Sequence, residues 1–146
     1  MRYRVLSRRA GLRVFELALC MGKFGHAVEE TEAIAVLGVY ADTGGRFLDT
    51  AAGYQNGAAE EIVGRFVADR REESVIGTKY GTGVPRGELF TARGNNRKAM
   101  VASVEASLRR LGTDYIDLLW THGYDPHVPL KEVLLAFGHL GRGIRS

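Results

Sequence analysis

The chain has 146 residues, of which 45% are hydrophobic and 25% are charged, the composition of an ordinary globular protein with one core. The formal net charge of +3 comes from basic residues scattered along the chain, which argues against a nucleic-acid-binding protein. No apolar run approaches the roughly 18 residues that a membrane-spanning helix needs, so no membrane association is expected.

Cys20 is the single cysteine, which excludes an internal disulfide and favours a reducing cytoplasm. Several arginines precede the apolar run that ends at Cys20, and this order loosely resembles an export signal. However, Glu16 interrupts the run, and bulky Leu19 lies where a cleavage site needs a small residue. A cytoplasmic protein is therefore the favoured interpretation, with export as the alternative.

The N-terminal segment predicts a β-hairpin that continues into a first strand. Polar and apolar side chains alternate over residues 3–6 and again over residues 13–19, and Ala10 and Gly11 are the expected turn between them.

Helices and strands then alternate. Residues 29–42 have helical spacing and end at Gly44, which can adopt a left-handed cap. Residues 46–49 predict a strand, residues 59–69 a helix and residues 74–79 another strand.

A third helix is expected after a loop rich in Gly, Pro and Thr, with Asn95 or Asn96 as its cap and Gly112 as its end. Its expected buried stripe is Val101, Val104, Leu108 and Leu111. Residues 115–122 are almost continuously apolar, as in a strand buried on both faces. Pro129 should open a last helix, with Leu130, Val133, Leu134, Phe137 and Leu140 facing the core. Residues 143–146 resemble the start of a further strand.

This alternation predicts parallel strands joined by right-handed crossovers. Four such units are half of a (β/α)8 TIM barrel, which usually has about 250 residues. The expected fold is therefore a partial α/β barrel of about four β/α units, preceded by an N-terminal β-hairpin. We expect residues 1–146 to form the N-terminal half, ending near the start of the fifth strand.

Four polar residues lie at or just beyond the C-terminal ends of predicted strands: Asp49, Tyr54, Lys79 and His122. A parallel sheet brings such ends to one edge, so they are candidates for one site. A tyrosine is a weak acid near neutral pH, but a nearby Lys79 would favour its phenolate, and Asp49 would compensate the buried ammonium. His122 could orient a carbonyl group, and a nicotinamide cofactor would have to supply a hydride.

Each of the four also has a purely structural explanation when taken alone. Asp49 could cap a strand, Lys79 could be a solvated strand end, Tyr54 could pack in a loop, and His122 could be a hydrogen-bonded core residue. Only their common position favours a catalytic site. No metal-binding set is predicted.

Three motifs in order resemble those of the aldo-keto reductase family. They are FLDTA at residues 47–51, followed by Tyr54, Gly57, Glu60 and Gly64; TKYG at residues 78–81; and RRLGTDYIDL at residues 109–118, running on to His122. The resemblance covers essentially the whole chain.

The resemblance implies an NADPH-dependent reductase of aldehydes or ketones. It implies that Tyr54 donates the proton, that Lys79 and Asp49 tune it, and that His122 orients the substrate. By the same resemblance, Phe24, Tyr80 and Trp120 could line an aromatic substrate pocket, although core packing explains them equally well.

The chain departs from the family where LALCM at residues 17–21 replaces a glycine-containing motif. Cys20, Met21 and Asp49 are the residues expected beside the cofactor. The side chains of Cys20 and Met21, where the family has its glycine-containing motif, could crowd it. The family's other cofactor residues lie beyond the fourth strand, in a half that this chain lacks. The alternative function is therefore a truncated, inactive remnant, or an interaction partner that self-associates through its open fourth-strand edge.

Overall fold

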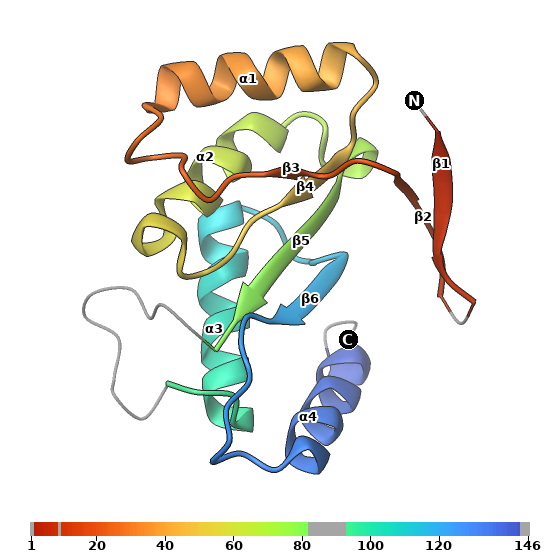
Figure 1. Ribbon diagram of the computed structural model, residues 1–146, viewed down its shortest axis with the longest axis vertical. Coiled ribbons are helices and arrows are strands. Elements are labelled where there is room, and N and C mark those ends of the chain that lie inside the picture. The colour runs from red at the N-terminus through yellow and green to blue at the C-terminus, as the bar shows by residue number, and fades with distance from the viewer. Residues whose placement is uncertain (1, 9, 82–92, 144–146) are drawn as a thin grey trace.

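A computed structural model describes residues 2–8, 10–81 and 93–143. It contains a two-stranded antiparallel sheet and a four-stranded parallel sheet against which helices pack (Figure 1). The strands are β1 (Tyr3–Ser7), β2 (Ala10–Phe15), β3 (Leu19–Cys20), β4 (Phe47–Asp49), β5 (Val75–Tyr80) and β6 (Leu118–Thr121). The helices are α1 (Glu30–Asp42), α2 (Ala58–Val67), α3 (Arg97–Leu111) and α4 (Leu130–Gly143), with short 3-10 helices η1 (Tyr54–Gly57) and η2 (Arg71–Glu73).

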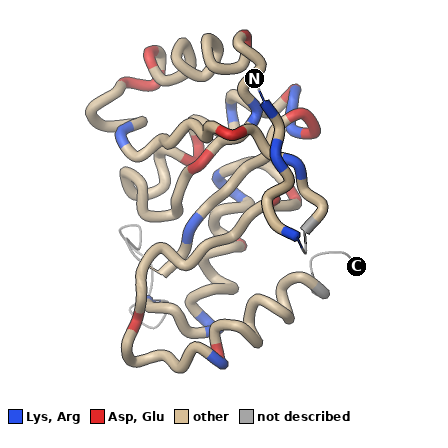
Figure 2. Tube along the Cα trace, turned by 45° about the vertical axis from the view of Figure 1, so that its right-hand side comes forward, with Lys and Arg blue, Asp and Glu red and all other residues tan. Residues whose placement is uncertain are grey.

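The predicted N-terminal hairpin is present as β1 and β2, and it extends away from the helices (Figure 1). Tyr3 lies opposite Phe15, with their ring centroids 4.1 Å apart. Ser7 pairs with Ala10, so the turn comes earlier than predicted and Gly11 lies inside β2. Several basic residues lie along this hairpin (Figure 2). One of them, Arg4 of β1, forms an ion pair with Glu16 at 3.1 Å.

The strands of the larger sheet are all parallel, in the order β3-β4-β5-β6. The register pairs Cys20 with Asp49, Asp49 with Gly77, and Lys79 with Trp120. Paired residues share a face of the sheet, and so do residues two apart along one strand. Cys20, Asp49, Lys79 and Trp120 therefore share one face, which we call the open face.

The helices cover the opposite face of the sheet. Leu48 of β4 and Ile76 of β5 pack in one buried cluster with residues of α1 and α2, including Leu37 and Ile62. Tyr80 of β5 packs in a second cluster with Met100 of α3 and with Val133 and Ala136 of α4. This arrangement of helices behind parallel strands is the partial barrel that the sequence predicts.

Two helix ends confirm the sequence prediction. Gly44 has φ +87°, its N–H bonds to the Ala41 carbonyl, and the Gly45 N–H bonds to the Tyr40 carbonyl, the pair of bonds found in a Schellman cap. Asn96 is the N-cap of α3, where its side chain accepts the Ala99 N–H at 2.9 Å.

The strand predicted at residues 115–122 is shorter and less buried than expected. Within the described residues β6 pairs only with β5, and Trp120 is 43% exposed. It is therefore an edge strand rather than one buried on both faces.

The prediction for α4 was partly wrong. Val133 and Ala136 are buried and Phe137 packs against them, but Leu130 and Leu134 are exposed. Leu130 and Leu134 lie one helical turn apart on a side that nothing in the described ranges covers. Gly143, the first residue of the further strand expected at residues 143–146, belongs to α4, and residues 144–146 lie outside the described part.

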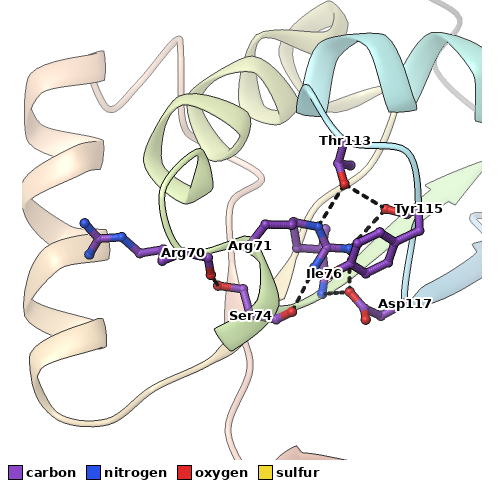
Figure 3. Close-up of polar contacts among 7 residues, drawn as sticks. All are labelled: Arg70, Arg71, Ser74, Ile76, Thr113, Tyr115 and Asp117. Carbon is purple, nitrogen blue, oxygen red and sulfur yellow. Dashed lines mark hydrogen bonds and ion pairs between the residues drawn. The ribbon is translucent and has the colours of Figure 1, made fainter.

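A cluster around Arg71 joins the N-terminal ends of β5 and β6 (Figure 3). The Arg71 guanidinium donates to the Asp117 carboxylate at 2.8 Å, to the Tyr115 carbonyl at 3.0 Å and to the Thr113 hydroxyl at 3.1 Å. Asp117 also accepts the Ile76 N–H at 2.9 Å. These bonds tie the segment before β6 to the start of β5.

None of the helices in the described ranges is long and apolar enough to cross a membrane.

Candidate active site

The structure brings together all four polar residues predicted from the sequence. Asp49 ends β4, Lys79 is the last residue but one of β5, and Tyr54 opens η1. His122 directly follows β6, and its N–H donates to the Tyr80 carbonyl at 2.8 Å, which continues the pairing with β5. The four side chains therefore meet at the C-terminal end of the parallel sheet, where the active sites of barrel enzymes are built.

Lys79 is the centre of this group. Its Nζ lies 2.6 Å from Asp49 Oδ2, 2.8 Å from the Thr50 carbonyl oxygen and 3.4 Å from the Tyr54 hydroxyl. The Lys79 and Asp49 side chains are only 17% and 21% exposed. The partly buried nitrogen thus has a carboxylate and a carbonyl as acceptors, which compensates its burial beside the tyrosine hydroxyl.

Tyr54 has a pKa above its ordinary value of 10.0, because burial and the Cys20 thiol raise it. Lys79 lowers this pKa, as predicted, but the two opposing effects outweigh it. The Cys20 Sγ lies 3.8 Å from the hydroxyl. Tyr54 is therefore protonated at neutral pH and has a proton to donate.

His122 lies beside the Tyr54 ring, edge to face, with the ring centroids 5.5 Å apart at 83°. Its pKa is below the ordinary 6.5, chiefly through burial and then through the charge of Lys79, which outweigh the opposite effect of Asp49. The imidazole is therefore neutral at pH 7. Its Nδ1 is buried without a hydrogen-bond partner among the described residues.

The turn that carries Tyr54 is strained. Gln55 and Asn56 have φ of 51° and 57°, and Gly57 follows with φ 95°. Left-handed conformations of residues other than glycine cost on the order of 1–3 kcal/mol and are often found at functional sites. The Gln55 side chain donates to the Gly22 carbonyl at 2.9 Å, which fastens this turn to the segment after β3.

The two residues predicted beside the cofactor differ in exposure. Cys20 is exposed on the open face next to Tyr54. Met21 is fully buried in the core cluster of α1 and α2, so its side chain has no surface toward the site.

The three predicted pocket residues are also separated. Trp120 lies on the open face with Lys79. Tyr80 directly follows Lys79 in β5 and points into the helices, because side chains alternate along a strand. Burial, and next the charge of Glu132, raise the pKa of Tyr80 to about 12. Phe24 packs in the core beside α1 and α2.

Sequence reasoning named Glu60 only as a motif residue and did not predict that it is buried near the site. Glu60 is fully buried on α2, with Thr78 and Arg110 as its partners. A charged residue on the apolar stripe that Val63 and Val67 continue was the signal that could have found it. The described residues contain no group of three or more His, Cys, Asp or Glu side chains that could hold a metal ion.

Comparisons with known proteins give a family match. Residues 16–143 match the model of the Aldo/keto reductase family. The chain is 37% identical over 153 residues to the aldo-keto reductase ausK of Aspergillus calidoustus, covering 95% of this chain and 39% of that protein. It is 36% identical over 151 residues to a norsolorinic acid reductase of Aspergillus flavus, covering 94% of this chain and 39% of that protein.

A third relative is shorter. The chain is 35% identical over 159 residues to the putative aryl-alcohol dehydrogenase AAD6 of Saccharomyces cerevisiae, covering 99% of this chain and 75% of that protein. Among solved structures, the holo form of aldo-keto reductase AKR11C1 from Bacillus halodurans matches with a TM-score of 0.85 and 32% identity. That match covers 97% of this chain and 47% of the other. The chain thus spans about 39% of the length of the two Aspergillus relatives.

Proposed function

The chain belongs to the aldo/keto reductase family, and from this premise we propose that it forms the N-terminal half of a (β/α)8 barrel that reduces an aldehyde or ketone to an alcohol. The observation that supports this most directly is the Tyr54 hydroxyl, 3.4 Å from Lys79 Nζ and beside a neutral His122. An acid, a cation and an uncharged hydrogen-bond donor are what carbonyl reduction needs at one place.

In the proposed reaction the carbonyl carbon gains a hydride and the carbonyl oxygen gains a proton. Tyr54 gives that proton, and Lys79 favours the phenolate that remains because the ammonium lies beside it. Asp49 holds the ammonium in place. His122 donates a hydrogen bond to the oxygen on which negative charge develops. Solvent then returns the proton to Tyr54.

The hydride would come from a nicotinamide cofactor, NADPH by family resemblance, because none of these side chains can transfer one. The open face fits a nicotinamide ring at Cys20 and Trp120, both exposed there, and at the Asp49 carboxylate. The fully buried Met21 side chain does not fit this role.

The test uses the purified 146-residue chain. We expect NADPH to bind, as measured by its fluorescence, and an aromatic aldehyde to be reduced at the expense of NADPH. Tyr54→Phe should lower the rate by about 10²–10⁴-fold while leaving NADPH binding intact, because it removes only the proton donor. The control is Tyr124→Phe, since Tyr124 is 87% exposed. Failure to bind NADPH, or equal rates for both variants, would refute the proposal for this chain.

A second candidate function is association, either with another copy or with a partner chain. It is favoured by the exposed Trp120 on edge strand β6 and by the exposed Leu130, Leu134 and Leu135 on α4. Apolar groups gathered near an unpaired strand edge promote association. A chain that neither binds NADPH nor turns over a carbonyl, but is oligomeric in solution, would fit this candidate instead.

A further inference from the structure

We propose that Glu60 is a positioning residue that holds Tyr54 and Lys79 in contact from behind the sheet. The proposal rests on the proposed function in one respect, namely that the contact between these two side chains serves proton donation.

Glu60 lies in the first turn of α2 and has no exposed surface. One carboxylate oxygen accepts the Thr78 hydroxyl at 2.6 Å, and the other accepts Arg110 Nε at 2.7 Å. The carboxylate therefore joins α2 to β5 on one side and to the last turn of α3 on the other. Its position between a hydroxyl and a guanidinium compensates the cost of burying the charge.

The bond to Thr78 acts on Lys79. Thr78 is fully buried and directly precedes Lys79 in β5. Side chains alternate along a strand, so fixing Thr78 on the helix side also fixes the direction in which the Lys79 side chain projects from the open face. Glu60 thereby sets the orientation of the strand segment that carries the ammonium.

The bond to Arg110 acts on Tyr54. Arg110 packs directly on Gly57, where a Cβ would lie only 2.6 Å from Arg110 Cδ. Gly57 is the last residue of η1, the strained turn that Tyr54 opens. The guanidinium held by Glu60 therefore closes off the space behind this turn and limits where Tyr54 can lie.

One carboxylate thus contacts both elements whose relative position determines the Tyr54–Lys79 distance of 3.4 Å. A general acid needs such fixed geometry, because a misplacement of about 1 Å can cost on the order of 100-fold in rate.

The test is the titration of Tyr54 in Thr78→Val and Thr78→Ser. Tyrosine ring-carbon NMR follows the phenol, and Tyr54→Phe identifies its signal. The titratable groups beside Tyr54 are Cys20, Lys79 and His122, with Asp49 bound to Lys79, and neither variant changes them. If Thr78→Val loosens the contact with Lys79, the pKa of Tyr54 should rise by about half a unit, a roughly threefold change in its ionisation constant. Thr78→Ser should restore the wild-type titration.

A structural control separates positioning from stability. Thr113→Val removes a hydroxyl that accepts from Arg71 at the other end of the sheet, so it should lower the melting temperature without moving the Tyr54 titration. Glu60→Gln, provided that it folds, should move the titration in the same direction as Thr78→Val. The proposal is overturned if Thr78→Val folds with a lowered melting temperature and an unchanged Tyr54 titration.

The titration needs neither cofactor nor carbonyl. A chain without reductase activity whose Tyr54 titration still responds to Thr78→Val would disprove the proposed reaction and leave the positioning role intact. An active chain whose Tyr54 titration does not respond to Thr78→Val would disprove the positioning role and leave the proposed reaction intact.

Discussion

At the scale of single residues, the site depends on how one ammonium is shared. Lys79 Nζ is closer to Asp49, at 2.6 Å, than to the Tyr54 hydroxyl, at 3.4 Å. The ammonium is therefore held by the carboxylate and is only a neighbour of the phenol. This explains why Lys79 lowers the pKa of Tyr54 without overcoming burial and the Cys20 thiol. The Tyr54 phenol therefore keeps its proton at neutral pH, and Lys79 stabilises the phenolate that forms when the proton is donated.

His122 should make the protein less stable as the pH falls below about 6.5. Its pKa is lowered in the folded protein, so the unfolded chain binds a proton at a higher pH than the folded chain. Stability is therefore lost as the pH falls from 6.5 toward the lowered folded value, and above that window this group contributes no pH dependence to the unfolding free energy.

His122→Gln should reduce the slope of unfolding free energy against pH in this window, by at most about 1.4 kcal/mol per pH unit. The measurement is urea unfolding of both proteins across the acidic range. Above about pH 7.5 the difference between the two proteins should be constant, which is the internal control. If the unfolding free energies of the two proteins change with pH in parallel over the whole range, folding does not disfavour the protonated form of His122.

At the scale of the elements, Arg71 of η2 and Arg70 directly before it should differ in how much each contributes to the unfolding free energy. The Arg71 and Asp117 side chains, bonded to each other in Figure 3, are 12% and 16% exposed. Arg70 instead bonds to the largely exposed Asp69. Arg71→Ala should cost about 3 kcal/mol of unfolding free energy, since it leaves a largely buried carboxylate without its partner.

Arg70→Ala is the matched control and should have a far smaller effect. Thermal and urea unfolding of the two variants measure the difference. Similar losses in both would mean that the Arg71 cluster does not stabilise the start of β5 and β6 more than a surface ion pair does.

Two helical glycines should respond in opposite ways to alanine. Gly38 of α1 has nothing within 4 Å of a built Cβ, so Gly38→Ala should stabilise the protein by about 0.5–1 kcal/mol through helix propensity. At Gly64 of α2 a Cβ would lie 2.7 Å from the carbonyl oxygens of Arg110 and Leu111, so Gly64→Ala should destabilise it by about 2 kcal/mol. A melting temperature that is unchanged or raised in Gly64→Ala would disprove the close approach of α2 and α3.

The element order could be predicted from the sequence, but the exposure of the elements could not. Periodicity and caps such as Gly44 and Asn96 are local signals, and they gave helix ends within one or two residues of those observed. The exposure of Leu134 and Trp120 depends on which elements lie beside α4 and β6. That information is not contained in the periodicity of either segment.

At the scale of the whole molecule, the topology made the common position of the candidate site residues predictable. Parallel strands place Asp49, Lys79 and His122 at one end because each follows or ends its strand. The roles of Tyr80 and Met21 were harder to predict, because one residue of register decides whether a side chain lies on the open face or in the core. The buried contacts of Glu60 were not predicted because its partners Thr78 and Arg110 are distant in sequence and meet it only after folding.

The edge of β6 that no strand in the described ranges covers leads to a prediction about assembly. The His122 N–H points to β5, and in a parallel ladder alternate residues direct their N–H groups to the same neighbour. The Thr121 N–H should therefore point to the free edge, where a second chain could pair with it. We expect the wild-type chain to self-associate with increasing concentration in sedimentation experiments, because this edge lies beside the exposed Trp120.

Thr121→Pro should shift the chain toward monomer, since proline removes the outward donor while the ladder to β5 keeps its bonds. Thr121→Ser keeps the N–H and is the control that should associate like the wild type. Far-ultraviolet circular dichroism must show that the proline variant is folded. If the wild type is a monomer at every concentration, or if a folded Thr121→Pro variant associates as strongly, then the β6 edge is not where the chains meet.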